Sequence, residues 1–146
     1  RLLVDIRHLV MFQADPDSAE IALETANSRN IPIHEAEQAV IGCNYAEVGA
    51  ALASSWHLPG GFAMVIGAQL RPALAGPHVT EAALLHLANQ ILATDEAENP
   101  DEAVLERMDP MTAAMLEISV ERISSIRATV RNEKSAVIAL FFPGRG

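Results

Sequence analysis

Histidine and carboxylate side chains at helical spacing are the groups in this chain that could bind a metal ion. Asp5 and His8 lie three residues apart, so both would project from one face of a helix. The pair could supply half of a metal site, but we favour a local ion pair. His86 lies three residues before Asn89 in an apolar stretch, and we interpret it as a hydrogen-bonded core histidine. No three of the five histidines have the spacing of metal ligands.

Other catalytic motifs are absent from the sequence. There is no Gly-x-Ser-x-Gly elbow, no Gly-Lys-Ser phosphate loop and no dinucleotide fingerprint. Gly60-Gly61 is interpreted as a turn, because no Lys followed by Ser or Thr stands at the spacing of a phosphate loop. Cys43 is the single cysteine, which excludes an intrachain disulfide and a cysteine-based zinc site. Glu35 and Glu37 are interpreted as solvated carboxylates.

Composition and charge favour a small helical domain. Half of the 146 residues are hydrophobic but only 4% are aromatic, and Ala, Leu and Met are strong helix formers. The net charge of −9 repels phosphate groups, so we expect no nucleic acid and no membrane partner. Arg127, Arg131 and Lys134 form no basic patch, because Glu121 and Glu133 lie beside them. Without a long apolar span or a signal peptide, we expect a cytoplasmic protein.

Apolar periodicity and cap residues predict an all-α fold of about six to nine helices. Asp15-Pro16 is typical of a helix start, and Asn44 can cap a later helix. Gly49 and Ala50 make that later helix thin, so that a neighbouring backbone can approach closely. The expected helices cover residues 2–12, 16–28, 33–41, 45–56, 62–70, 82–93, 101–107, 110–118 and 119–132.

Three segments need separate interpretations. Residues 94–100 are acidic and polar, which predicts a mobile surface loop. The apolar end, residues 135–143, is either a helix docked on the core or a short buried strand, and we favour the helix. The opening helix begins on Arg1 and Leu2 without a capping side chain. We therefore expect either a missing N-terminal segment packed on it or a homodimer.

Several ordered segments resemble one family, the HDOD domains, which are bacterial relatives of the metal-dependent HD phosphohydrolases. Asn44 to Ala50 reads Asn-Tyr-Ala-Glu-Val-Gly-Ala, where the family usually has Asp-His-Ala-Glu-Val-Gly-Ala. Gln69-Leu70-Arg71-Pro72 stands where the family often has His-His-x-Pro. Further landmarks are residues 3–9, 31–37, 56–59 and 87–89. The resemblance is good from Leu2 to Leu92, and it implies that residues 1–146 are the C-terminal part of one HD-like helical domain, without the family's N-terminal helices.

The resemblance also implies a site whose metal ligands have been replaced. A His-Asp doublet is expected where Val4-Asp5 stands, and a late Asp where Asn89 stands. The positions that match the family's ligands, and that we expect to line one vestigial pocket, are Val4, Asp5, Tyr45, Gln69, Leu70 and Asn89. Asp5 alone among them is a good metal ligand. We therefore expect no catalytic metal, no cofactor and no enzyme activity.

The expected function is that of a non-catalytic output domain in bacterial signal transduction, which acts on protein partners or fused signalling modules. One alternative is an HD-type phosphohydrolase that acts on a nucleotide or cyclic dinucleotide and keeps Asp5 as a remnant ligand. Another is a nucleotide sensor that retains the pocket without turnover.

Overall fold

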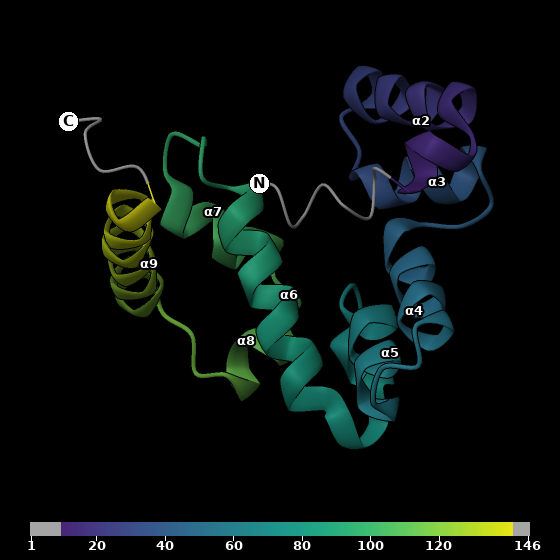
Figure 1. Ribbon diagram of the computed structural model, residues 1–146. Helices are drawn as coiled ribbons and strands as arrows, with labels where there is room; N and C mark the ends of the chain where they lie inside the picture. The colour runs from purple at the N-terminus through teal and green to yellow at the C-terminus, as the bar shows by residue number, and fades with distance from the viewer. Residues whose placement is uncertain (1–9, 142–146) are drawn as a thin grey trace. The chain divides into compact units, whose positions relative to one another are not determined.

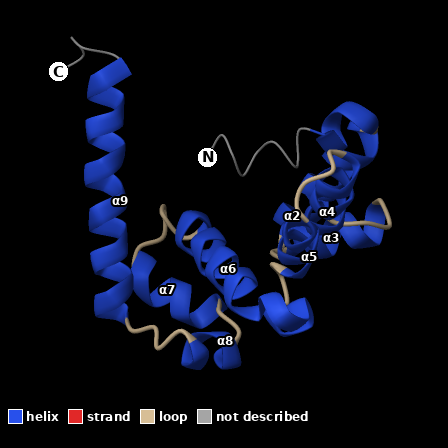
Figure 2. Cartoon of the chain, turned by 60° about the horizontal axis from the view of Figure 1, so that its bottom comes forward, coloured by secondary structure: helices blue, strands red, loops and turns tan. Residues whose placement is uncertain are grey.

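The chain is built from helices joined by short loops (Figures 1 and 2). In this computed structural model residues 10–141 are described, and side-chain surroundings are described for residues 10–133. Residues 10–14 are helical. The following helices are α2 (Pro16–Arg29), α3 (Ile33–Val40), α4 (Tyr45–Ser55), α5 (Gly60–Ala68), the 3₁₀-helix η1 (Pro72–His78), α6 (Val79–Ala93), α7 (Pro100–Arg107), α8 (Pro110–Met115) and α9 (Val120–Phe141). No strand occurs among residues 10–141, and the all-α prediction is confirmed.

Local sequence signals explain most of the helix starts and ends. Asp15 accepts a hydrogen bond from the Ser18 backbone N–H at 3.2 Å, and hydrogen bonding by Ser18 lowers the pKa of the Asp15 carboxyl. Asn44 and Glu47 form a capping box at the start of α4. Asn30 ends α2 in the left-handed conformation with φ 51°. The predicted starts at Asp15-Pro16 and Asn44 are therefore confirmed.

The chain divides into two compact units, Arg1–His86 and Leu87–Gly146, and the boundary lies within α6. This division was not predicted from the sequence. In the first unit, α2 packs on α3 through the small side chains of Ala22, Ala26 and Ala36. Because alanines fill these contacts, the backbones of neighbouring helices lie close together.

The packing of α4 on α5 shows the same use of small residues. Both helices belong to the first unit, and a Cβ atom placed on Gly67 would lie 3.3 Å from the Cβ of Ala50. Ala46 and Ala53 on α4 are buried, as is Ala68 on α5. The expected thin helix around Gly49 and Ala50 is confirmed, and Gly67 is its counterpart on α5.

The second unit has its own apolar core. Leu87, Val104, Met108 and Ile123 are buried together, each no more than 5% exposed. The partly buried side chains around them are Ile91, Leu105, Ala113, Leu116, Ile118 and Ile126. The unit therefore has a small aliphatic core of the kind that the composition predicted.

One predicted turn was wrong. Gly60 and Gly61 form the first turn of α5, because Pro59 is extended (φ −48°, ψ 140°) and its carbonyl accepts the Phe62 N–H at 2.9 Å. Gly61 also lies against the ring of His78, and a Cβ at Gly61 would be 2.9 Å from His78 Cε1. His78 ends η1, a helix that the sequence analysis did not predict.

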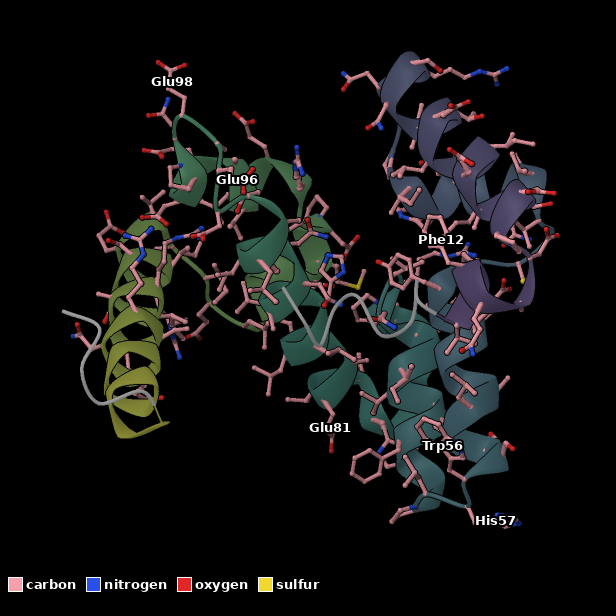
Figure 3. All side chains as sticks on the ribbon, turned by 45° about the horizontal axis from the view of Figure 1, so that its top comes forward. Phe12, Trp56, His57, Glu81, Glu96 and Glu98 are labelled. Carbon is pink, nitrogen blue, oxygen red and sulfur yellow. The ribbon has the colours of Figure 1, made fainter. Side chains whose placement is uncertain are left out.

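The remaining segments are the predicted surface loop and the two ends of the chain. Residues 94–99 form a loop between α6 and α7, and the side chains of Glu96 and Glu98 lie on it (Figure 3). Pro100, which was expected in this loop, is the first residue of α7, and the mobility of the loop stays a prediction. Helix α9 continues to Phe141, so the helical interpretation of the apolar end is confirmed up to that residue. Most of the expected opening helix, residues 2–9, lies outside the described residues, and so do Phe142 and Pro143 of the apolar end. Within the described part, no helix is both long enough and apolar enough to span a bilayer.

Candidate ligand-binding pocket

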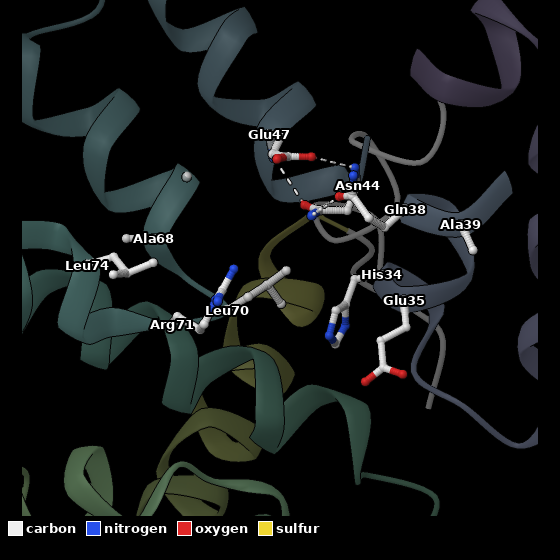
Figure 4. A pocket seen from close by; sticks show the side chains of 11 residues that line it. His34, Glu35, Gln38, Ala39, Asn44, Glu47, Ala68, Leu70, Arg71 and Leu74 are labelled. Atoms are coloured by element: carbon white, nitrogen blue, oxygen red, sulfur yellow. Dashed lines mark hydrogen bonds between the residues drawn. The ribbon is translucent and has the colours of Figure 1, made fainter. Parts of the chain in front are cut away.

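The first unit contains a pocket of about 780 Å³. One wall consists of α3 and the start of α4, and the other of the end of α5 and the start of η1 (Figure 4). The lining residues are His34, Glu35, Gln38, Ala39, Asn44 and Glu47 on the first wall and Gly67, Ala68, Leu70, Arg71 and Leu74 on the second. A polar wall thus lies opposite a more apolar one.

A hydrogen-bonded network holds the polar rim where α3 meets α4. Asn44 donates from its backbone N–H to Oε2 of Glu47 at 3.0 Å and from Nδ2 to Oε1 of Gln38 at 3.1 Å. Gln38 donates from Nε2 to the carbonyl of Gly42 at 2.8 Å. Because these contacts already engage the polar groups of the rim, its shape is preorganised rather than formed by a ligand.

Glu37 corrects an expectation. It was interpreted as a solvated carboxylate, but its side chain is 3% exposed, and Oε2 accepts the backbone N–H of Tyr45 at 2.9 Å. Tyr45 is the first residue of α4, whose N–H groups have no partner within the helix. The positive end of the helix dipole also favours a carboxylate there. Glu37 therefore joins α3 to α4 behind the pocket, and Glu35 alone of the two is exposed.

His34 lies on the polar wall beside Tyr45. The two rings are in a T-shaped arrangement, with centroids 6.3 Å apart and an interplanar angle of 86°. Burial lowers the pKa of His34 below its usual 6.5, against the opposing effect of Glu35 and Glu37, and the charge of His86 lowers it further. At neutral pH the ring is therefore uncharged and offers one donor and one acceptor.

Arg71 and Glu35 bring opposite charges to the two walls. Both side chains are exposed and line the pocket. Neither has a hydrogen bond or an ion pair to any residue that the structure describes. Leu70 and Leu74 lie on the same wall as Arg71, and Leu74 is 67% exposed. The pocket therefore offers a guanidinium beside aliphatic surface, and a carboxylate across from both.

Gln69 and His86 lie together in the interior of the first unit. Gln69 is fully buried, its Nε2 donates to the Ile66 carbonyl at 2.6 Å, and its own carbonyl accepts Nδ1 of His86 at 2.7 Å. Since a carbonyl only accepts, Nδ1 is the donor of this hydrogen bond. No partner for this buried Nε2 occurs among the described residues. His86 is thus a core histidine, as predicted, although only one of its nitrogens is hydrogen-bonded there.

The six residues expected to share a vestigial pocket are only partly placed. Val4 and Asp5, and with them the Asp5–His8 pair, lie outside the described residues. Tyr45, Gln69 and Leu70 belong to the first unit, where Leu70 alone of the three lines the pocket. Asn89 belongs to the second unit. The convergence of all six stays a prediction.

The side chains that sequence reasoning missed are those whose partners are distant in the chain. Arg71 was noted only as part of the Gln69 to Pro72 segment, and no local pattern placed it across from Glu35. Among the described residues, no group of three or more His, Cys, Asp or Glu side chains could hold a metal ion. The described arrangement is therefore a pocket that offers hydrogen-bonding groups, the Glu35 carboxylate on one wall, the Arg71 guanidinium on the other, and aliphatic contact.

Comparison with known proteins gives one match. The family model of the HDOD domain matches residues 2–72, which include the pocket residues from His34 to Arg71. The resemblance was expected to extend to Leu92, but the family model matches only as far as residue 72. Asn89 therefore lies outside the matched residues. Neither the curated proteins nor the solved structures that were compared with the chain gave a match.

Proposed function

Because residues 2–72 belong to the HDOD domain family, we propose that this chain is a non-catalytic output domain of a bacterial signalling protein. It regulates by binding a protein partner in the cytoplasm and turns over no nucleotide. The supporting observations come from the positions that correspond to metal ligands in HD phosphohydrolases.

The observation that carries the proposal is the environment of Gln69. Its side chain is 0% exposed, and its amide nitrogen donates to the Ile66 carbonyl at 2.6 Å, one turn back in the chain. A fully buried amide whose nitrogen donates to the backbone is expected to pack the interior rather than bind a metal ion. The next residue, Leu70, brings an aliphatic side chain to the pocket wall. Both positions therefore serve packing and surface shape.

A metal and activity assay tests the proposal. The purified chain is analysed for bound transition metal and assayed with added manganese or iron against cyclic dinucleotides and a generic phosphodiester. We expect no stoichiometric metal and no turnover above background. Asp5→Ala is the informative variant, because Asp5 is the one good ligand left in the family's pattern. Asp17→Ala is its matched control, since Asp17 lies exposed in the first turn of α2.

Turnover that Asp5→Ala abolishes and Asp17→Ala retains would establish the phosphohydrolase instead. A thermal-shift screen against nucleotides and cyclic dinucleotides separates the remaining alternative. We expect no shift with any of them. A shift that saturates with nucleotide, without turnover, would identify a nucleotide sensor and overturn the protein-binding role.

A further inference from the structure

Two unpaired charges face one another across the pocket of the first unit. The Glu35 carboxylate lies on the α3 wall, and the Arg71 guanidinium lies at the start of η1 on the other wall (Figure 4). Both are exposed, and neither forms a hydrogen bond or ion pair with the described residues. A ligand that enters between them meets a cation on one side and an anion on the other.

The other charged group of the pocket is already engaged. Glu47 accepts the Asn44 backbone N–H through Oε2 and completes the capping box of α4. Asn44 and Gln38 are likewise hydrogen-bonded within the rim. Glu35 and Arg71 are therefore the two charges that remain for recognition.

The charge of the lining residues disfavours a ligand with several phosphate groups. Among the described residues, Arg71 is the one Lys or Arg side chain in the lining, while Glu35 and Glu47 both carry negative charge. A nucleotide would bring several negative charges into a pocket with one cation, in a chain of net charge −9. A ligand with one group of each sign fits the lining better.

The apolar wall favours a ligand that also carries an aliphatic group. Leu74, which is 67% exposed, and Leu70 lie beside Arg71, with Ala68 next to them in the same wall. Aliphatic surface of this kind is covered by an aliphatic side chain of the ligand. A guanidinium can hold a carboxylate through two parallel hydrogen bonds, which also orients the group it binds.

We propose that this pocket binds a peptide segment of a partner protein in which an aliphatic side chain lies between one acidic and one basic residue. The acidic residue pairs with Arg71, the aliphatic side chain lies on Leu70 and Leu74, and the basic residue pairs with Glu35. The inference rests on the proposed protein-binding function and names the chemistry of the partner.

A peptide-display selection with charge-reversed variants tests it. The whole chain is presented as wild type, as Arg71→Glu, as Glu35→Arg, and as the double variant that exchanges the two charges. Arg107→Glu with Glu106→Arg is the matched control, because both residues are exposed on α7 and neither lines the pocket. Circular dichroism melting verifies that each variant is folded before selection.

We expect wild type and the control to enrich the same peptides, with an acidic, an aliphatic and a basic residue in a constant order. Each single reversal is expected to weaken the selected peptides at least about tenfold, as loss of one charge-assisted hydrogen-bonded pair predicts. The double variant is expected to enrich peptides with the acidic and basic positions exchanged. This exchange is a change of preference that a misfolded variant could not produce.

Three outcomes would overturn the inference. In the first, the wild type enriches no peptide; in the second, Arg71→Glu and Glu35→Arg enrich the same peptides as the wild type. In the third, the wild-type chain binds itself instead of a peptide, and the charge reversals abolish this self-association. If peptides bind independently of Arg71 and Glu35, the proposed protein-binding function is retained, but another surface of the chain carries it. Phosphodiester turnover in the separate activity assay would instead remove the proposed function itself.

Discussion

Arg127 donates from Nε to Oδ1 of Asp101 at 2.8 Å, and this part-buried contact joins α9 to α7 in the second unit. The same guanidinium donates from Nη1 to Asp95 at 2.9 Å and to the Ile91 carbonyl at 3.0 Å. Nη2 reaches Thr94 Oγ1 and the Pro100 carbonyl, each at 3.3 Å. The loop of residues 94–99 is therefore anchored at both ends, although most of its side chains are exposed.

Replacing Arg127 should destabilise the second unit. Its side chain is 7% exposed, and removing it leaves the Asp101 carboxylate, itself 19% exposed, without its cation. For Arg127→Met we expect a loss of about 3 kcal/mol in the free energy of unfolding, measured by urea denaturation. Arg131→Met is the control, because Arg131 is 65% exposed and 3.5 Å from Asp95, so that its loss should cost less than about 1 kcal/mol. Equal losses in the two variants would contradict the buried anchor.

Glu37 should matter for stability, and Glu35 should not. Glu37→Ala removes a buried carboxylate that accepts the part-buried Tyr45 N–H, whereas Glu35 is exposed on the same helix. We expect Glu37→Ala to lower the free energy of unfolding by about 1–3 kcal/mol and Glu35→Ala by less than about 0.5 kcal/mol. Thermal or chemical denaturation measures both. A Glu37→Ala chain as stable as the wild type would show that its carboxylate is dispensable.

Gly60 and Gly61, although adjacent, should respond oppositely to alanine. A Cβ at Gly60 meets no atom within 4 Å, so Gly60→Ala should stabilise the chain by about 0.5 kcal/mol through reduced freedom of the unfolded state. A Cβ at Gly61 would lie 2.9 Å from His78 Cε1, so the His78 ring, whose Nδ1 lies 3.9 Å from Glu81 Oε1, would have to shift. We expect Gly61→Ala to be destabilising in wild type and neutral or stabilising in a His78→Ala background. Denaturation midpoints of the four variants decide this, and a destabilisation that persists without His78 would refute the contact.

His34 should make stability fall as the pH is lowered. Its folded pKa is below the usual 6.5, so the unfolded chain binds more protons in the interval between the two values. The corresponding stability is fully present above pH 6.5 and is lost as the pH falls from there toward the folded pKa. Unfolding free energies from about pH 7.5 to about pH 5 should therefore decline less steeply in His34→Gln than in wild type. His57→Gln, at an exposed position outside the pocket lining, is the control for the loss of an imidazole elsewhere in the first unit.

The all-α fold and most helix bounds follow from the sequence because their causes are local. Asp15 caps a residue three positions away, and Asn44 and Glu47 cap each other within one turn. The family was also accessible from short ordered segments, and its match to residues 2–72 confirms it. One local signal was misleading: Gly60-Gly61 was interpreted as a turn, but the extended Pro59 precedes a helix that begins at Gly60.

The pocket and the buried polar contacts were decided by tertiary structure. Glu37 and Tyr45 are 8 residues apart, Gln69 and His86 are 17, and Arg127 and Asp101 are 26, so no helical period relates the members of a pair. Composition specified that helices would form and which residue types would fill their cores. The packing of those helices decides which carboxylate is buried and which charges lie on opposite walls of a pocket. The reason is that burial and distance set the energy of a charge.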